Sequence, residues 1–137
     1  MGLALHRGRR QCEHAFVSVQ GSANARFRRA LLTGNPTIVS AAAAELGTLS
    51  LSDALGVCLV FAPHDSARFE RAAVRWQARY CLEQRPAADE AQLVAAALRA
   101  LPGPAGAAGA EALLELCEAR ELRDAAAHIE RWVRSRA

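Results

Sequence analysis

The chain has 137 residues, of which 52% are hydrophobic and 23% are charged, and its formal net charge is +3. This length suits one domain, and the composition is that of a globular chain, not of a disordered one. No stretch approaches the roughly 18–20 uninterrupted apolar residues of a membrane span. No secretory signal precedes the four cysteines, so we expect a cytoplasmic protein with reduced thiols.

Two compositional biases stand out. Alanine occurs 32 times, which favours helix because alanine loses no side-chain entropy there. All 17 basic residues are arginine. Arginine grips phosphate or carboxylate through two hydrogen bonds, but GC-rich coding produces the same bias, so composition alone does not separate the two explanations.

The first third of the chain predicts a basic arm and two helices. Residues 1–22 show no helical period and carry Arg7, Arg9 and Arg10, which predicts a poorly ordered arm or, alternatively, an arm that contacts nucleic acid. One helix is predicted over 23–33. A second is predicted over 37–46, because Asn35-Pro36 is typical of an N-cap followed by proline in the first turn.

The middle of the chain predicts two helices of different character. Ser50 is an N-cap candidate for residues 51–62, which are almost continuously apolar and are therefore expected at the buried centre. Asp65 or Ser66 is expected to cap a longer helix that ends near Gln84.

The last third predicts three helices and one linker. A helix is expected over 88–101, followed by a Pro/Gly-rich linker over 102–109. Residues 111–134 are expected to divide into two helices near Arg120, because the apolar stripes on the two sides of this residue are out of phase. We predict an all-α fold for one helical domain over 23–137, either a six- or seven-helix antiparallel bundle or a short stack of helical hairpins.

Two resemblances agree with this fold. The Gly34-Asn35-Pro36 junction within residues 23–62 resembles a helical hairpin of the tetratricopeptide type, although the aromatic and glycine signature of that repeat is missing. Residues 27–83 resemble a set of small uncharacterised helical proteins of high-GC bacteria, a resemblance that implies a helical fold and no known activity. The segments that carry it are 26–31, 34–35 and 68–76.

The predicted helix over 66–84 has the most suggestive pattern. Its aromatic residues share one stripe, and beside it runs a row of four arginines, Arg68, Arg71, Arg75 and Arg79. Like charges at this spacing repel by a few tenths of a kcal/mol per pair, so the row is expected to meet anions. Those anions are the phosphates of a ligand, an acidic partner, or carboxylates of neighbouring helices such as Glu111, Glu115 and Glu118.

The same helix has a second apolar side opposite the aromatic stripe, formed by Val74, Ala78, Cys81 and Leu82. A helix that is apolar on two sides either lies centrally in the bundle or contacts another protein chain.

No pattern predicts catalysis or a metal site. Cys12 and His14 lack the second local pair that would complete four ligands. Helix capping accounts for the acid and hydroxyl of His64-Asp65-Ser66. Asp124 and His128, four residues apart, predict an ordinary solvated face. We therefore expect no enzyme activity and no cofactor.

We expect a small helical protein–protein interaction module that docks a protein partner or a second copy through residues 66–84, without membrane contact. One alternative is a nucleic-acid-associated protein that binds phosphates through arginine-rich faces. Another is a small-molecule-binding bundle that uses Trp76, Tyr80 and Trp132. The candidate residues for binding a partner or phosphate are Arg68, Arg71, Arg75, Arg79, Trp76, Arg26, Arg28 and Arg29.

Overall fold

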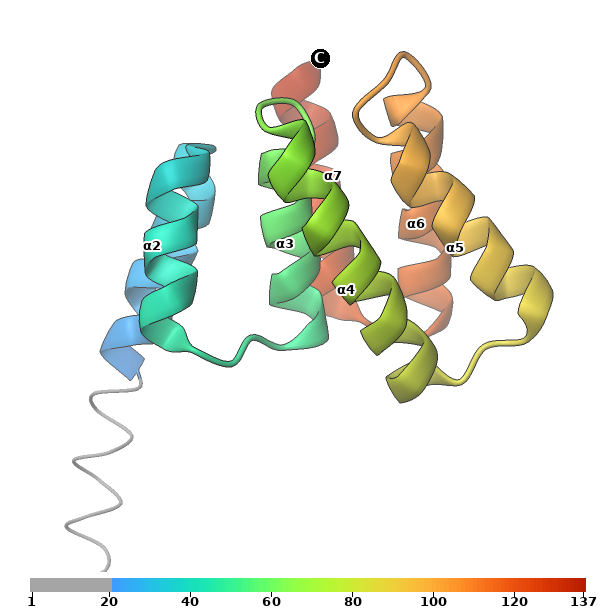
Figure 1. Cartoon of the computed structure of the whole chain (residues 1–137), viewed down its shortest axis with the longest axis horizontal. Coiled ribbons are helices and arrows are strands. Elements are labelled where there is room, and N and C mark those ends of the chain that lie inside the picture. The colour runs from blue at the N-terminus through green and yellow to red at the C-terminus, as the bar shows by residue number, and fades with distance from the viewer. Residues whose placement is uncertain (1–20) are drawn as a thin grey trace, which may run out of the picture. The chain divides into compact units, whose positions relative to one another are not determined.

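The computed structural model describes residues 21–137, and this part of the chain contains seven helices and no strand (Figure 1). The predicted all-α class is confirmed. The first helix covers 21–33 and therefore begins inside the predicted arm, whose residues 1–20 lie outside the described part. The helices that follow are α2 (Pro36–Leu46), α3 (Leu51–Phe61), α4 (Ser66–Gln84), α5 (Ala88–Ala100), α6 (Gly106–Ala119) and α7 (Arg123–Arg136).

Side-chain capping marks the starts of three of these helices, α2, α3 and α4. The Asn35 side chain accepts hydrogen bonds from the Thr37 and Ile38 amides at 3.0 and 3.2 Å. Ser50 Oγ accepts from the Asp53 amide, and Asp65 Oδ1 accepts from the Arg68 amide, each at 3.0 Å. Each cap pairs an amide that a helix start leaves without an intrahelical acceptor. The predicted caps at Asn35 and Ser50 are confirmed, and Asp65 is the cap of α4.

The chain divides into two compact units at the boundary between Thr48 and Leu49, where the sequence had predicted one domain over 23–137. The segment at this boundary is mostly exposed, and Gly47 has a φ of 81°, which ends α2 in a conformation that favours glycine. The first unit pairs helix 21–33 with α2. Its buried residues are Ala23, Phe27, Ala30 and Val39.

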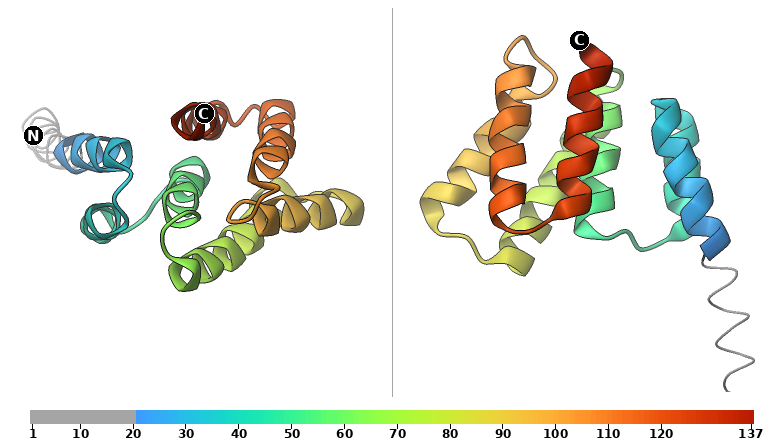
Figure 2. Two further views of the ribbon diagram at one scale, coloured as in Figure 1. Left: turned by 90° about the horizontal axis from the view of Figure 1, so that it is seen from above. Right: turned by 180° about the vertical axis from the view of Figure 1, so that it is seen from behind.

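The second unit is a closed ring of five helices. Each helix from α3 to α7 packs against the next, and α7 returns to pack against α3. Figures 1 and 2 show α4 and α5 on one side of this unit and α6 and α7 on the other. Seven of the eleven residues of α3 are buried, which confirms the predicted buried centre.

Two tryptophans hold α3 in place through its backbone. Trp76 of α4 donates its indole N–H to the Leu51 carbonyl, and Trp132 of α7 donates to the Leu59 carbonyl, both at 2.8 Å. The Leu59 carbonyl is a group that needs such a donor, because the residue four positions later is Pro63 and has no N–H.

The predicted linker over 102–109 is wrong in its second half, because α6 begins at Gly106. Gly106 and Gly109 are buried against α5. A Cβ on Gly109 would lie 2.6 Å from the Ala97 carbonyl oxygen, and one on Gly106 would lie 2.7 Å from that of Leu101. These glycines therefore allow close helix packing. The predicted division near Arg120 is confirmed, since α6 ends at Ala119 and α7 begins at Arg123.

We predict that Gly109→Ala destabilises the fold even though alanine is the better helix former. The added methyl group would meet backbone atoms of α5, and overpacking of this kind costs roughly 1–3 kcal/mol, against about 1 kcal/mol gained in helix propensity. Urea unfolding measures the net loss. Gly103→Ala is the matched control, because its Cβ would lie 3.8 Å from the nearest atom, the Ala100 carbonyl oxygen. Equal unfolding midpoints for the two variants would contradict the close approach of α5 and α6.

Candidate interaction surface on helix α4

Helix α4 turns its aromatic stripe toward the core, where Phe69, Trp76 and Tyr80 are buried. The Trp76 and Tyr80 rings lie 5.2 Å apart between centroids. Trp76 was a candidate binding residue, but it is 1% exposed and its N–H is bonded to Leu51. Trp132 is likewise buried and bonded to α3.

The arginine row of α4 is divided between paired and unpaired side chains. Arg79 donates to the Leu49 carbonyl at 2.9 Å and to Glu83 at 3.0 Å. Arg68 forms an ion pair with Asp65 at 3.4 Å and lies 5.9 Å from the centre of the Phe61 ring. Arg71 and Arg75 are exposed and have no hydrogen-bonding or ionic partner among residues 21–137. The row is thus only half neutralised.

The carboxylates that were expected to neutralise the α4 arginines lie on α6, away from this row. Within the described chain Glu111, Glu115 and Glu118 form no ion pair with it, because α4 packs against α3 and α5 and not against α6. The prediction of neutralisation by these carboxylates within one chain is therefore wrong.

The second apolar side of α4 faces solvent. Val74 is 70% exposed and Leu82 is 77% exposed, the highest fractions among the large hydrophobic residues of the described chain. Ala78 lies between them at four-residue spacing and is also exposed. Because residues four apart form one ridge on a helix, these three side chains make a continuous apolar ridge beside the row that contains Arg71 and Arg75. We call these five residues the α4 surface.

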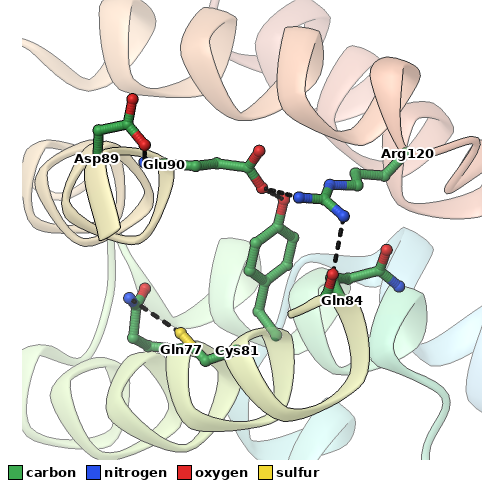
Figure 3. A network of polar contacts seen from close by, with 7 residues as sticks. Gln77, Cys81, Gln84, Asp89, Glu90 and Arg120 are labelled. Carbon is green, nitrogen blue, oxygen red and sulfur yellow. Dashed lines mark hydrogen bonds and ion pairs between the residues drawn. The ribbon is translucent and has the colours of Figure 1, made fainter. Parts of the chain in front are cut away.

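A polar network fixes the C-terminal end of α4 (Figure 3). The Tyr80 hydroxyl donates to Glu90 Oε2 of α5 at 2.7 Å. Arg120, at the end of α6, donates to the same oxygen and to the Gln84 carbonyl, both at 2.8 Å. Sequence analysis missed Glu90 and assigned Arg120 only to a turn, because no local spacing links residues on three different helices.

The network shifts the ionisation of its members. The Arg120 hydrogen bond, followed by that of Tyr80, holds the pKa of Glu90 below its ordinary value. Burial, followed by the hydrogen bond to Glu90, raises the pKa of Tyr80. At neutral pH the network therefore holds a carboxylate, a guanidinium and a neutral phenol, which is a structural arrangement that joins α4, α5 and α6.

Two other groups of reactive side chains are used in packing. His128 is 11% exposed at its side chain and lies 3.1 Å from Asp53 of α3, so the predicted solvated face is wrong for His128, whereas Asp124 is exposed as predicted. Arg131 donates to His128 Nδ1, which leaves the Nε2 proton for Asp53. Burial raises the pKa of the Cys58 and Cys117 thiols to about 12, which keeps both protonated near neutral pH.

The arginine candidates outside α4 lie in the first unit. Arg26 forms an ion pair with Glu45 of α2. Arg28 and Arg29 are exposed and have no partner among the described residues. Arg7, Arg9 and Arg10 lie outside the described residues.

Residues 21–137 contain neither a metal-binding cluster nor a membrane-spanning helix. No group of three His, Cys, Asp or Glu side chains there is arranged to hold a metal ion. None of the described helices combines the length and the apolar character needed to cross a membrane. Comparison with models of protein families, with curated proteins and with solved structures found no match.

We predict that Glu90→Gln lowers stability most at neutral pH. Because the pKa of Glu90 is lowered by folding, its contribution is complete above the unfolded pKa and is lost as the pH falls through the folded pKa. Urea midpoints of the wild type and the variant should therefore differ near pH 7 and converge below about pH 4. Glu83→Gln removes only an exposed ion pair of α4 and should change the midpoint little. If both substitutions have equal effects at pH 7, the network does not hold α4.

Proposed function

We propose that this chain is a helical protein–protein interaction module whose α4 surface binds an acidic amphipathic helix. The observation that carries the proposal is the exposed ridge of Val74, Ala78 and Leu82 beside two arginines without partners in the described chain. An apolar side chain that is three-quarters exposed adds nothing to the core, and apolar surface rimmed by charge is a common property of interaction sites.

The shape of the α4 surface suits a helix. A ridge of residues four apart packs beside the corresponding ridge of a second helix. Ala78 leaves a low point between Val74 and Leu82, which can receive one larger apolar side chain. Amphipathic helices bind such surfaces with anchors spaced three to four residues apart.

The charge of the α4 surface defines the chemistry of the partner. Arg71 and Arg75 are adjacent on one side of the ridge, so carboxylates of a partner placed on that side would receive two charge-assisted hydrogen bonds or more. Phosphates of a nucleic acid would pair with the same guanidiniums but would leave Val74 and Leu82 exposed. The acidic helix uses both parts of the surface, and for this reason we favour it.

We predict that a fluorescein-labelled helical peptide with leucines at three- and four-residue spacing and glutamates beside them binds the full chain. We expect Kd on the order of 10 μM by fluorescence anisotropy. Leu82→Asp should weaken binding at least tenfold, because it removes an apolar anchor worth about 1.5–3 kcal/mol. The double variant Arg71→Glu/Arg75→Glu should do the same by repelling the glutamates.

Leu32→Asp is the matched control, since Leu32 is 66% exposed in the first unit and should not affect the peptide. A peptide with lysine in place of glutamate should not bind. Equal affinity of all variants would remove the α4 surface as the site. If the peptide fails to bind while a short DNA duplex is retarded at low salt only when Arg71 and Arg75 are present, phosphate binding replaces this proposal.

A further inference from the structure

The outward side of α6 carries the opposite charge. Glu111, Glu115 and Glu118 are all exposed, lie on one face at spacings of four and three residues, and form no ion pair within the described chain. Helix α6 contains no basic residue, and carboxylates at this spacing repel one another. The small side chain of Ala108 is exposed on the same face toward the N-terminal end.

One unit therefore contains two complementary faces that do not meet each other. Helix α4 does not pack against α6 along its length, and the two helices are joined only near their C-terminal ends within the described chain, where Arg120 donates to the Gln84 carbonyl. The α4 surface is basic with an apolar end, and the α6 face is acidic with a small apolar end. Neither is neutralised by any of residues 21–137, although each has the charge that the other lacks.

We propose that the acidic helix recognised by the α4 surface is α6 of a second copy of this chain. This inference rests on the proposed function and names its partner. Contact between two α4 surfaces is disfavoured, because a parallel contact would place arginines against arginines and an antiparallel contact would place Arg71 against Leu82 with no carboxylate for either guanidinium. Contact between α4 of one copy and α6 of the next pairs arginine with glutamate.

The positions of the side chains select an antiparallel arrangement of the two helices. The arginines lie in the N-terminal half of the α4 surface and Leu82 lies at its C-terminal end, whereas the glutamates extend to the C-terminal end of α6 and Ala108 precedes them. A parallel arrangement would place Leu82 beside Glu118 and Arg71 beside Ala108. The antiparallel arrangement pairs Arg71 with Glu118, Arg75 with Glu115, Ala78 with Glu111 and Leu82 with Ala108, and it leaves Val74 at the edge of the contact.

The spacings match along the whole contact. Contact residues on α4 follow one another at intervals of four, three and four residues, and those on α6 at three, four and three. At 1.5 Å per residue the series on α4 covers roughly 16.5 Å and that on α6 roughly 15 Å. Alternation of three and four is the spacing at which two helices keep one seam over several turns.

This contact is head-to-tail, because each copy contributes two different faces. A chain of copies then leaves one free α4 surface and one free α6 face at its ends, so association continues unless the geometry closes a ring. The contact is small and partly electrostatic. It should therefore be weak and should weaken further when salt screens the charges.

Charge reversal on each face tests the arrangement in the full chain. The α4-reversed variant is Arg71→Glu/Arg75→Glu, and the α6-reversed variant is Glu115→Arg/Glu118→Arg. Light scattering of the wild type should show a mass that rises with concentration at about 0.05 M salt and returns to that of the monomer at about 0.5 M. Each variant alone should stay monomeric.

An equimolar mixture of the two variants should regain association, because each face of one variant then meets a face of opposite charge on the other. A chain that carries both reversals should regain association, since glutamate on α4 then meets arginine on α6. This regain also shows that the substitutions leave the fold intact. Arg134→Glu/Glu130→Arg on α7 is the matched control and should associate like the wild type.

The outcomes separate this inference from the proposed function. If the wild type stays monomeric at all concentrations but binds the acidic peptide through α4, the second copy is not the partner and the proposed function stands. If the wild type associates but the mixed variants stay monomeric, another face is responsible and this inference is overturned. The α6-reversed variant should still bind the peptide, whereas the α4-reversed variant should not.

Discussion

The second unit depends on the burial of α3, a helix with almost no polar side. Such a helix needs neighbours on several sides, and it cannot satisfy its terminal carbonyl groups with its own side chains. The indoles of Trp76 and Trp132 each bury a large apolar surface against α3 and donate one hydrogen bond to an α3 carbonyl, and the Trp132 bond reaches a carbonyl of the last turn. Pro63 has no backbone N–H and cannot donate to the Leu59 carbonyl, so this carbonyl needs a donor from another helix.

These indole bonds also fix the rotation of α4. With Trp76 directed to Leu51 and Tyr80 directed to Glu90, the opposite side of the helix has to face outward. The Arg79 bond to the Leu49 carbonyl adds a third restraint along the same helix. The bonds of Trp76, Tyr80 and Arg79 thus hold α4 so that Val74 and Leu82 face solvent. A rigid helix supports a binding surface well, because less conformational entropy is lost when the partner binds.

Signals within one or two turns of helix were enough to predict most of the fold. Asn35, Ser50 and Pro36 locate helix starts because a cap is a contact between near neighbours in the chain. Features that depend on distant residues were not predictable. In the sequence Gly109 looks like a linker glycine, and only the structure shows that a Cβ there would lie 2.6 Å from the backbone of α5. His128 and Asp53, which are in contact, are 75 residues apart in the sequence. For the candidate site, periodicity identified the two apolar sides of α4, but only the three-dimensional packing distinguishes paired from unpaired arginines.

Half-buried charged groups and the exposed charges of α4 and α6 differ in whether they have ionic partners among the described residues. Half-buried charged groups are matched inside the chain, as Arg120 is by Glu90, and Arg26 is matched by Glu45 within the first unit. The arginines of the α4 surface and the glutamates of α6 have no such partner among the described residues, and each group bears the repulsion of like charges at helical spacing. A partner of opposite charge relieves that repulsion on both helices at once. Alanine at positions 78 and 108 then has a physical role on the surface too, because small side chains let two helices approach until the charged rows beside them are within reach.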